Sequence, residues 1–415
     1  MRIFWQEMKK IWRPWMILAV GAVMVLGYFL LVNNQFGDYR GSGYQIAEQW
    51  VKRYGPTMEE DERRDAEKDV LAVEREMDEW IANQPEFAAA GIFDHHDWDD
   101  YRNRTGKFEN LSEDWEDWEE TDEILYDLLF GYDYETNSWK SDDLGMRYQD
   151  IPGMLESYDT RNELFDLDDP DYGYSQSQIA NLEWQNQLKK ADGLRGLLPR
   201  DAFYNLYYPV IYFALLAVLG VFLLLSPYPV RDRLRDVRPL QWTSKTGRKL
   251  ARVQFGAMLV SAFLLTTAVL IPCFLKYLST GDAVFFDCPV NGFLSGVELS
   301  WNLTLGQWVM VCFIFCYIAA LGAASFAYLL ARSCSGYVSM LLKEVLLFVP
   351  LIVAVFYLST GGGIIRSSGV LYPVGTLDYA TGIPGAGFLT VCLILAAGIA
   401  ACLFAAHRQR RKELV

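Results

Sequence analysis

The sequence predicts an all-α polytopic membrane protein with six transmembrane helices and a mainly helical extracytoplasmic domain between spans one and two. Residues 33–205 hold 43 Asp/Glu and 17 Lys/Arg, a net charge of −26, whereas the whole chain of 415 residues carries −15. The remainder is apolar with basic connections, and its apolar runs are long enough to cross a bilayer. A single water-soluble core is therefore excluded.

The N-terminal residues 1–13, MRIFWQEMKKIWR, combine an apolar helical stripe with basic residues. We predict an amphipathic cytoplasmic helix lying along the membrane surface, with its stripe formed by Ile3, Phe4, Met8, Ile11 and Trp12. Pro14 then permits a turn into the first span, 14–32. A cleaved signal peptide is the alternative, but no A-x-A site follows the apolar run, so an uncleaved span is favoured.

The acidic domain, residues 33–205, shows mostly helical signals. Helices are predicted over 44–54, from Thr57 onward, over 112–130 and over 176–190, and Gly55-Pro56 ends the first of them. Thr57-Met58-Glu59-Glu60 has the spacing of a capping box for the second. Glu59–Arg63 and Glu60–Arg64 are i,i+4 pairs that would support it.

The same domain contains Asp94-His95-His96-Asp97, whose side chains are of the kinds that bind divalent ions. Neither an EF-hand spacing nor HExxH accompanies it, and adjacent residues rarely converge on one ion. We therefore predict no metal site. The acidity itself suits either the attraction of cationic ligands or a solvated surface, and the solvated surface is favoured.

Residues 206–406 hold the five further spans, predicted over 206–225, 253–275, 305–330, 337–358 and 387–406. Residues 226–252 form a basic loop between spans two and three, and 359–386 form a glycine-rich connection whose apolar pieces suit a re-entrant segment. The chain ends in a basic tail, 407–415.

The basic loop determines the predicted orientation. Pro229–Arg252 carries eight Lys/Arg against two acids, Asp232 and Asp236. Loops of this composition lie on the cytoplasmic side. We therefore predict a multi-pass plasma membrane protein with both termini cytoplasmic and residues 33–205 outside. Attraction to anionic lipid suffices to explain these charges.

The sequence lacks the common short motifs of nucleotide binding, metal-dependent or serine hydrolysis, and thiol chemistry. The chain has no GxxxxGK[ST], HExxH, GxSxG or CxxC. Ionisable residues are also missing from the interiors of the predicted spans, where a proton- or sodium-coupled carrier usually keeps them. We expect no enzymatic activity and no cofactor in this chain, and we expect driving energy to come from another subunit.

The MRIFWQEMKKIWRPW start and the stretch T-S-K-T-G-R-K at 243–249 resemble the type-two permeases of ATP-binding-cassette (ABC) exporters, in particular Firmicute-like members with a large outer domain. The resemblance covers the whole chain in topology. It implies an elbow helix at 1–13 and a coupling helix in 226–252 that rests on a separate ATPase. The implied contact residues are Thr243, Lys245, Gly247, Arg248 and Lys249.

The same resemblance implies the partners. ATP and Mg would be bound by the separate ABC ATPase subunit, and a second permease, identical or a sister subunit, would complete the path. Membrane lipid is a further partner, and no nucleic acid is expected. The size of the acidic domain favours peptide or lipid cargo over polysaccharide. The competing hypothesis is a membrane-anchored sensor or scaffold, whose acidic outer domain binds a cationic ligand or an envelope partner.

Overall fold

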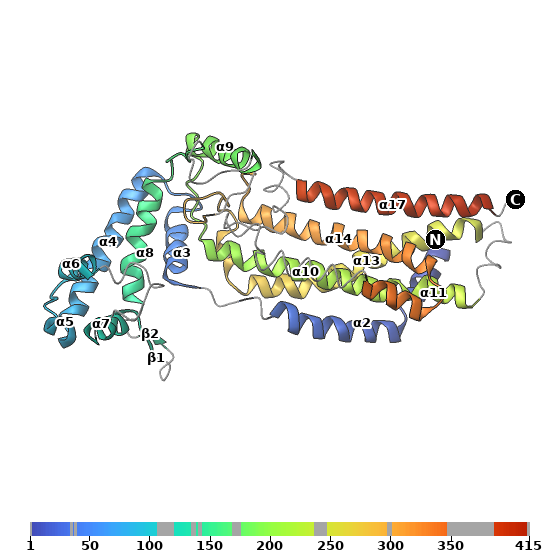
Figure 1. The fold of residues 1–415 in the computed structure, drawn as a ribbon, viewed down its shortest axis with the longest axis horizontal. Helices are drawn as coiled ribbons and strands as arrows, with labels where there is room; N and C mark the ends of the chain where they lie inside the picture. Colours follow the sequence, from blue (N-terminus) through green and yellow to red (C-terminus); the bar gives the residue numbers. More distant parts are fainter. Residues whose placement is uncertain are drawn as a thin grey trace.

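The structure is a computed structural model that describes residues 2–33, 36, 40–105, 120–133, 138–139, 143–167, 176–235, 247–296, 301–346 and 386–412. These residues are mainly helical. They form an elongated bundle of long helices with a domain of shorter helices at one end (Figure 1). The N-terminus and the C-terminus both lie at the opposite end of the bundle.

Four helices in the described part are long and apolar enough to cross a membrane: Pro14–Val32, Arg200–Leu234, Leu250–Leu278 and Leu305–Ser333. They coincide with predicted spans one to four. The first is α2 (Pro14–Gly27) followed by one stretch of π-helix, η1 (Tyr28–Val32). Large apolar side chains remain exposed along these helices, among them Leu18, Phe263, Ile271 and Met310. Exposed apolar surface of this extent is compatible with a location in lipid.

The structure describes parts of the predicted spans five and six. Residues 337–346 are helical, but 347–385 lie outside the described residues, and so does most of the 359–386 connection. Helix α17 (Ala386–Lys412) covers the predicted sixth span, and Cys392–Ala405 is the apolar stretch found within its described residues. The count of six therefore stays a prediction.

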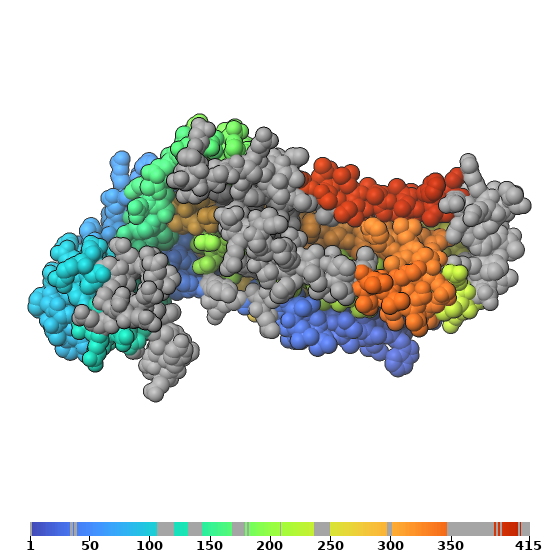
Figure 2. Space-filling model, viewed as in Figure 1, coloured from blue at the N-terminus to red at the C-terminus, as the bar shows by residue number. Residues whose placement is uncertain are grey.

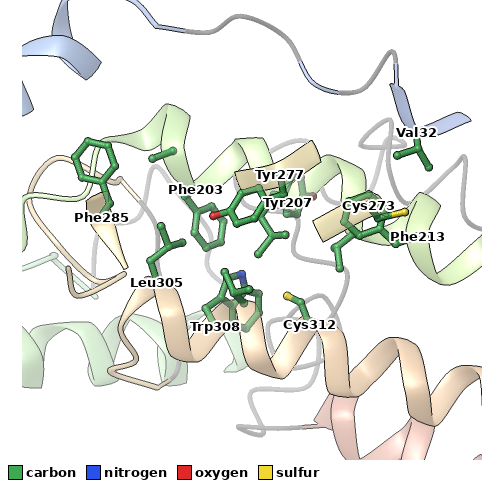
Figure 3. Close-up of a cluster of buried hydrophobic side chains, with 14 of the residues drawn as sticks. Val32, Phe203, Tyr207, Phe213, Cys273, Tyr277, Phe285, Leu305, Trp308 and Cys312 are labelled. Carbon is green, nitrogen blue, oxygen red and sulfur yellow. The ribbon is translucent and has the colours of Figure 1, made fainter. Parts of the chain in front are cut away.

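Helix α10 (Arg200–Leu225) occupies the centre of the bundle and packs against α13 (Gly247–Leu278), α14 (Leu305–Ser333) and α2. Figure 3 shows part of this core, in which Phe203 stacks on Trp308 with ring centroids 6.0 Å apart. α2 and α17 lie at opposite edges of the bundle (Figures 1 and 2). Small residues bring α17 close to α14: a Cβ on Gly398 would lie 3.1 Å from that of Ser325.

The acidic domain is built on two antiparallel helices, α4 (Glu60–Ile81) and α8 (Leu144–Asp159). Arg63 pairs with Asp159 at 2.8 and 2.6 Å, and Arg147 pairs with Glu76 at 3.0 and 2.7 Å. The smaller elements around them are α3 (Ser42–Tyr54), α5 (Pro85–Ala89), α6 (His95–Thr105), α7 (Glu120–Phe130), α9 (Gln176–Lys190) and the two-residue strands β1 (Tyr132–Asp133) and β2 (Ser138–Trp139).

Several predicted helices are confirmed. α3 ends at Tyr54, before Gly55 with φ 99°, and α9 has the predicted bounds. Of the predicted helix 112–130, the described part is helical from Glu120, and 106–119 lie outside the described residues. Helices α5, α6 and α8 were not predicted.

The predicted capping box at Thr57 is wrong by two residues. α4 begins at Glu60, and the reciprocal cap joins Glu59 to Glu62, while Thr57 forms a β-bridge with Gly196. The predicted i,i+4 pairs of Glu59 and Glu60 are not formed either. Basic residues distant in the sequence pair with these acids instead: Arg195 with Glu59 and Arg161 with Glu60.

One buried carboxylate joins the acidic domain to the bundle. Asp282, in the short 3-10 helix η4 (Asp282–Phe285) after α13, is fully buried. It accepts hydrogen bonds from the Tyr44 hydroxyl (2.9 Å), the Asn205 amide (3.3 Å) and the Thr280 hydroxyl (2.6 Å). α3, α10 and the end of α13 therefore meet at one side chain. Burial raises the pKa of Asp282 above its usual value, although these three hydrogen bonds oppose the shift.

We expect the contribution of Asp282 to stability to depend on pH. Because its folded-state pKa is raised, the folded protein holds this proton more tightly than the unfolded chain. Its contribution to the free energy of unfolding is largest below the unfolded pKa and falls as pH rises through the folded pKa. The difference in unfolding free energy between wild type and Asp282→Asn, measured by thermal unfolding in detergent, should therefore decrease from about pH 4 upward.

Asp61→Asn is the matched control, because Asp61 is an exposed carboxylate on α4. A difference between wild type and Asp282→Asn that does not change with pH would contradict the prediction.

Candidate functional site

A buried polar cluster lies at the end of the bundle away from the acidic domain, where the basic loop begins and ends. It is formed by α1 (Arg2–Ile11), by α11 (Pro227–Leu234), which continues from α10, and by the first turns of α13. We call it the inner cluster, and its polar members are Glu7, Lys10, Tyr228, Arg231, Asp232 and Gln254.

Glu7 is the centre of the inner cluster. Its side chain sits on the packed face of α1 and the residue is only 3% exposed. The Tyr228 hydroxyl donates to Oε2, Lys10 Nζ lies 2.6 Å from Oε1, and Gln254 Nε2 lies 3.4 Å from Oε2. A buried carboxylate is tolerated only where a cation and hydrogen-bond donors surround it. These three groups provide both.

Gln254 connects the two sides of the loop. The same Nε2 that approaches Glu7 donates to Asp232 Oδ2 on α11 at 3.0 Å. Arg231, the neighbour of Asp232, donates to the backbone carbonyl of Lys10 at 2.8 Å. α1 is thus hydrogen-bonded to the helix that enters the basic loop, and both are bonded to the helix that leaves it.

The position of α1 refines the expectation of a surface helix. Its Met8 and Ile11 are buried, and Trp12 just beyond it donates from Nε1 to Ser261 Oγ of α13 at 2.9 Å. Ile3 and Trp5 are exposed on the other side. α1 is therefore docked on the bundle through one face, and contact of the opposite face with lipid stays a prediction.

The ends of the other long helices on this side of the bundle are linked to the same region. Arg233 of α11 donates to the backbone carbonyl of Cys334, after α14, at 2.8 Å. On α14, Arg332 donates to the Tyr328 hydroxyl, and that hydroxyl lies 3.4 Å from the carbonyl of Ala251 on α13. The segments on both sides of the loop are therefore also fixed to α14.

The five residues proposed for coupling are only partly described. Thr243 and Lys245 belong to 236–246, outside the described residues. Gly247 is the first described residue of α13. Arg248 and Lys249 follow in its first turn, and the positions of their side chains are outside what the structure describes. Their grouping into one contact surface stays a prediction.

Glu7 was not predicted as a functional residue from the sequence. The signal was its position: Phe4, Met8 and Ile11 form the apolar stripe, and Glu7 falls inside that stripe. An acid at such a place is buried when the helix docks, so it requires partners from the docking surface.

The possible metal ligands near Asp94 have other roles. His95 Nδ1 lies 2.7 Å from Asp78 Oδ1, and the His95 backbone N–H donates to the same oxygen at 2.8 Å. Asp94 accepts from the backbone N–H of Asp97 in α6, and Asp97 accepts from the backbone N–H of Phe93, just before α6. Within the described residues, no group of three potential ligands comes together.

Comparison of the chain with models of protein families, with curated proteins and with solved structures finds no match. The functional argument therefore depends on the residues and geometry above.

Tyr228→Phe tests whether the inner cluster holds α1 in place. Loss of the hydroxyl removes one donor from a buried carboxylate, which costs roughly 1–3 kcal/mol. We expect proteolysis within 1–13 to accelerate by about tenfold in the folded protein, because local opening becomes easier. Limited digestion followed by mass spectrometry measures this rate.

Tyr212→Phe on α10 is the matched control, since Tyr212 has no hydrogen bond within the described residues. Equal digestion rates for the two variants would contradict a role of the inner cluster in fixing α1.

Proposed function

We propose that this chain is the membrane-spanning permease subunit of an ABC exporter, forming the translocation path and coupled to a separate ATPase through the loop 226–252. The observation that carries the proposal is the inner cluster. Glu7, Asp232 and Gln254 tie the two segments that flank this loop to each other and to α1. A force applied to the loop therefore acts on α1, α11 and α13 together.

Two of these hydrogen-bonded segments extend through the whole bundle. α10 leads directly into α11, and α13 runs without interruption for 32 residues. Both reach the junction at Asp282, through Asn205 and Thr280. Because helices are stiff, a displacement at the inner end is carried to the other end as a rigid-body movement. This is the mechanical requirement of a permease driven from outside its own chain.

The proposal includes the features that the sequence predicts. Six spans, a plasma membrane location, cytoplasmic termini and an extracytoplasmic acidic domain all belong to it. So do a second permease, identical or a sister subunit, and ATP with Mg on the partner ATPase. No catalytic residue is assigned to this chain.

Charge reversal in the loop tests the coupling assignment. In reconstituted vesicles, we expect Arg248→Glu with Lys249→Glu to reduce stimulation of a co-purified ABC ATPase by at least about tenfold, the effect of losing one good contact. Expression and membrane insertion should persist. The measurement is lipid-dependent ATP turnover with and without this chain.

Arg2→Glu with Lys9→Glu is the control, because it makes the same change of charge on α1 rather than in the loop. Unchanged stimulation by the loop variant would refute the coupling assignment. If no ATPase co-purifies and deletion of 59–190 abolishes a signalling response, the sensor or scaffold hypothesis replaces the permease.

A further inference from the structure

A cavity of about 260 Å³ lies where the acidic domain meets the connection between α13 and α14. Its walls come from α8 and the turn after it, from α9, and from residues 291–296. The residues that give it chemical character are Arg161, Phe165, Gln185, Lys189, Asn291 and Phe293. The inner cluster lies at the other end of the molecule, so this cavity is a separate site.

Arg161 forms a rigid, buried base for the cavity. Its side chain is 6% exposed, with Nη2 2.8 Å from Glu60 Oε1 and Nε 3.3 Å from Asp192 Oδ1. Its guanidinium carbon lies 3.7 Å from the centroid of the Tyr158 ring. The guanidinium is held by partners on several sides, so it is positioned before any ligand arrives, which reduces the entropic cost of binding.

Gln185 is the observation that indicates a ligand. It is 8% exposed, it lines the cavity, and its amide has no hydrogen-bond partner within the described residues. The amide atoms themselves are not enclosed by protein and open into the cavity, where a bound molecule can pair with them. The amide of its neighbour Asn186 is instead used within the protein, bonding the backbone N–H and carbonyl of Phe165 at 2.8 and 3.0 Å. The free amide of Gln185 is available to a molecule in the cavity.

The charge of the lining differs from that of the domain around it. Among the described lining residues, two are cationic and none is acidic. Glu60 and Asp192 compensate the charge of Arg161, so Lys189 is the cation that gives the lining its character. Lys189 Nζ is held 2.6 Å from the Glu163 carbonyl and 3.7 Å from the Phe165 ring centroid. Phe165, Phe293 and Leu188 supply apolar walls.

We propose that this cavity binds a small organic carboxylate with an apolar body, such as an acylated amino acid or the carboxyl end of a peptide. The carboxylate faces Lys189 and the Gln185 amide, and the apolar part packs against the phenylalanine rings. The volume is slightly below that of sites for drug-sized ligands, which matches one or two amino-acid residues. The acidity of the domain does not decide this preference, because the lining and not the distant surface contacts the ligand.

The site joins two parts of the molecule, so binding stabilises their docking. Tyr158 on α8 contacts Phe293 edge-on at 5.3 Å, and a Cβ on Gly292 would lie 2.4 Å from the Gly196 carbonyl oxygen. A ligand that touches α9 and the connection together binds only the docked form. It must therefore raise the thermal stability of the protein as its concentration rises.

The test uses the full chain in detergent with N-acetyl-L-leucine as the probe and N-acetyl-L-leucinamide as its neutral counterpart. The acetyl group removes the ammonium that Lys189 would repel. Isothermal titration calorimetry and thermal unfolding measure binding. We expect saturable binding of the acid and at least about tenfold weaker binding of the amide, the effect of losing one charge-assisted contact.

Two pairs of variants on α9 locate the site. Lys189→Met and Gln185→Leu should each weaken binding of the acid by about tenfold. Lys190→Met and Gln187→Leu are the matched controls, because both residues are exposed on the same helix and neither lines the cavity. Without probe, thermal unfolding of Gln185→Leu should resemble that of wild type, since the change removes no hydrogen bond within the described residues.

The proposal is overturned if the acid shows no saturable binding up to about 10 mM, a concentration well above a weak millimolar affinity. It is also overturned if the acid and the amide bind equally well. Equal loss of binding in the α9 variants and their controls would overturn it too.

Discussion

Burial of α10 is the constraint on which the rest of the structure depends. Most of its apolar stretch is inside the molecule, so it has no room for polar side chains except at its ends. Both ends carry the same combination of groups. At one, Asn205 and Tyr44 donate to the buried carboxylate of Asp282. At the other, Gln254 and Tyr228 donate to the buried carboxylate of Glu7. Carboxylate, tyrosine and amide thus fix a peripheral helix at each end of the bundle.

These two arrangements give the molecule specificity more than stability. A buried carboxylate loses its hydration, and its partners recover that cost only when their geometry is good. Apolar packing of α1 or α3 alone would permit sliding along the bundle, because one apolar contact resembles the next. Glu7 and Asp282 each find their donors at a single position. They therefore set the register in which α1 meets the basic loop and α3 meets the end of α13.

The sequence predicted the features that depend on local composition. Apolar runs located spans one to four, and Gly55-Pro56 marked the end of α3. Features that depend on distant residues were not predictable in this way. α8 contains Gly145, Pro152 and Gly153, which argue against a helix, yet its packing against α4 outweighs them. Glu59 and Glu60 pair with Arg195 and Arg161 instead of their helical neighbours. For the candidate site, the charge of the loop 226–252 was enough to predict its importance. The role of Glu7 was not predictable, because it depends on the surface against which α1 packs.

The connection between α13 and α14 links the cavity to the ends of both helices. Asp282 and the cavity residues Asn291 and Phe293 belong to this one segment. Backbone hydrogen bonds fasten it to the start of α14, from Leu305 to Cys288 at 2.9 Å and from Gly306 to Phe286 at 2.8 Å. A ligand that holds this segment against α9 therefore restricts α13 and α14 at the same time. In a permease driven through the loop 226–252, movement of α13 and α14 would reach the cavity. Ligand binding in the cavity and movement of the loop would then act on the same two helices.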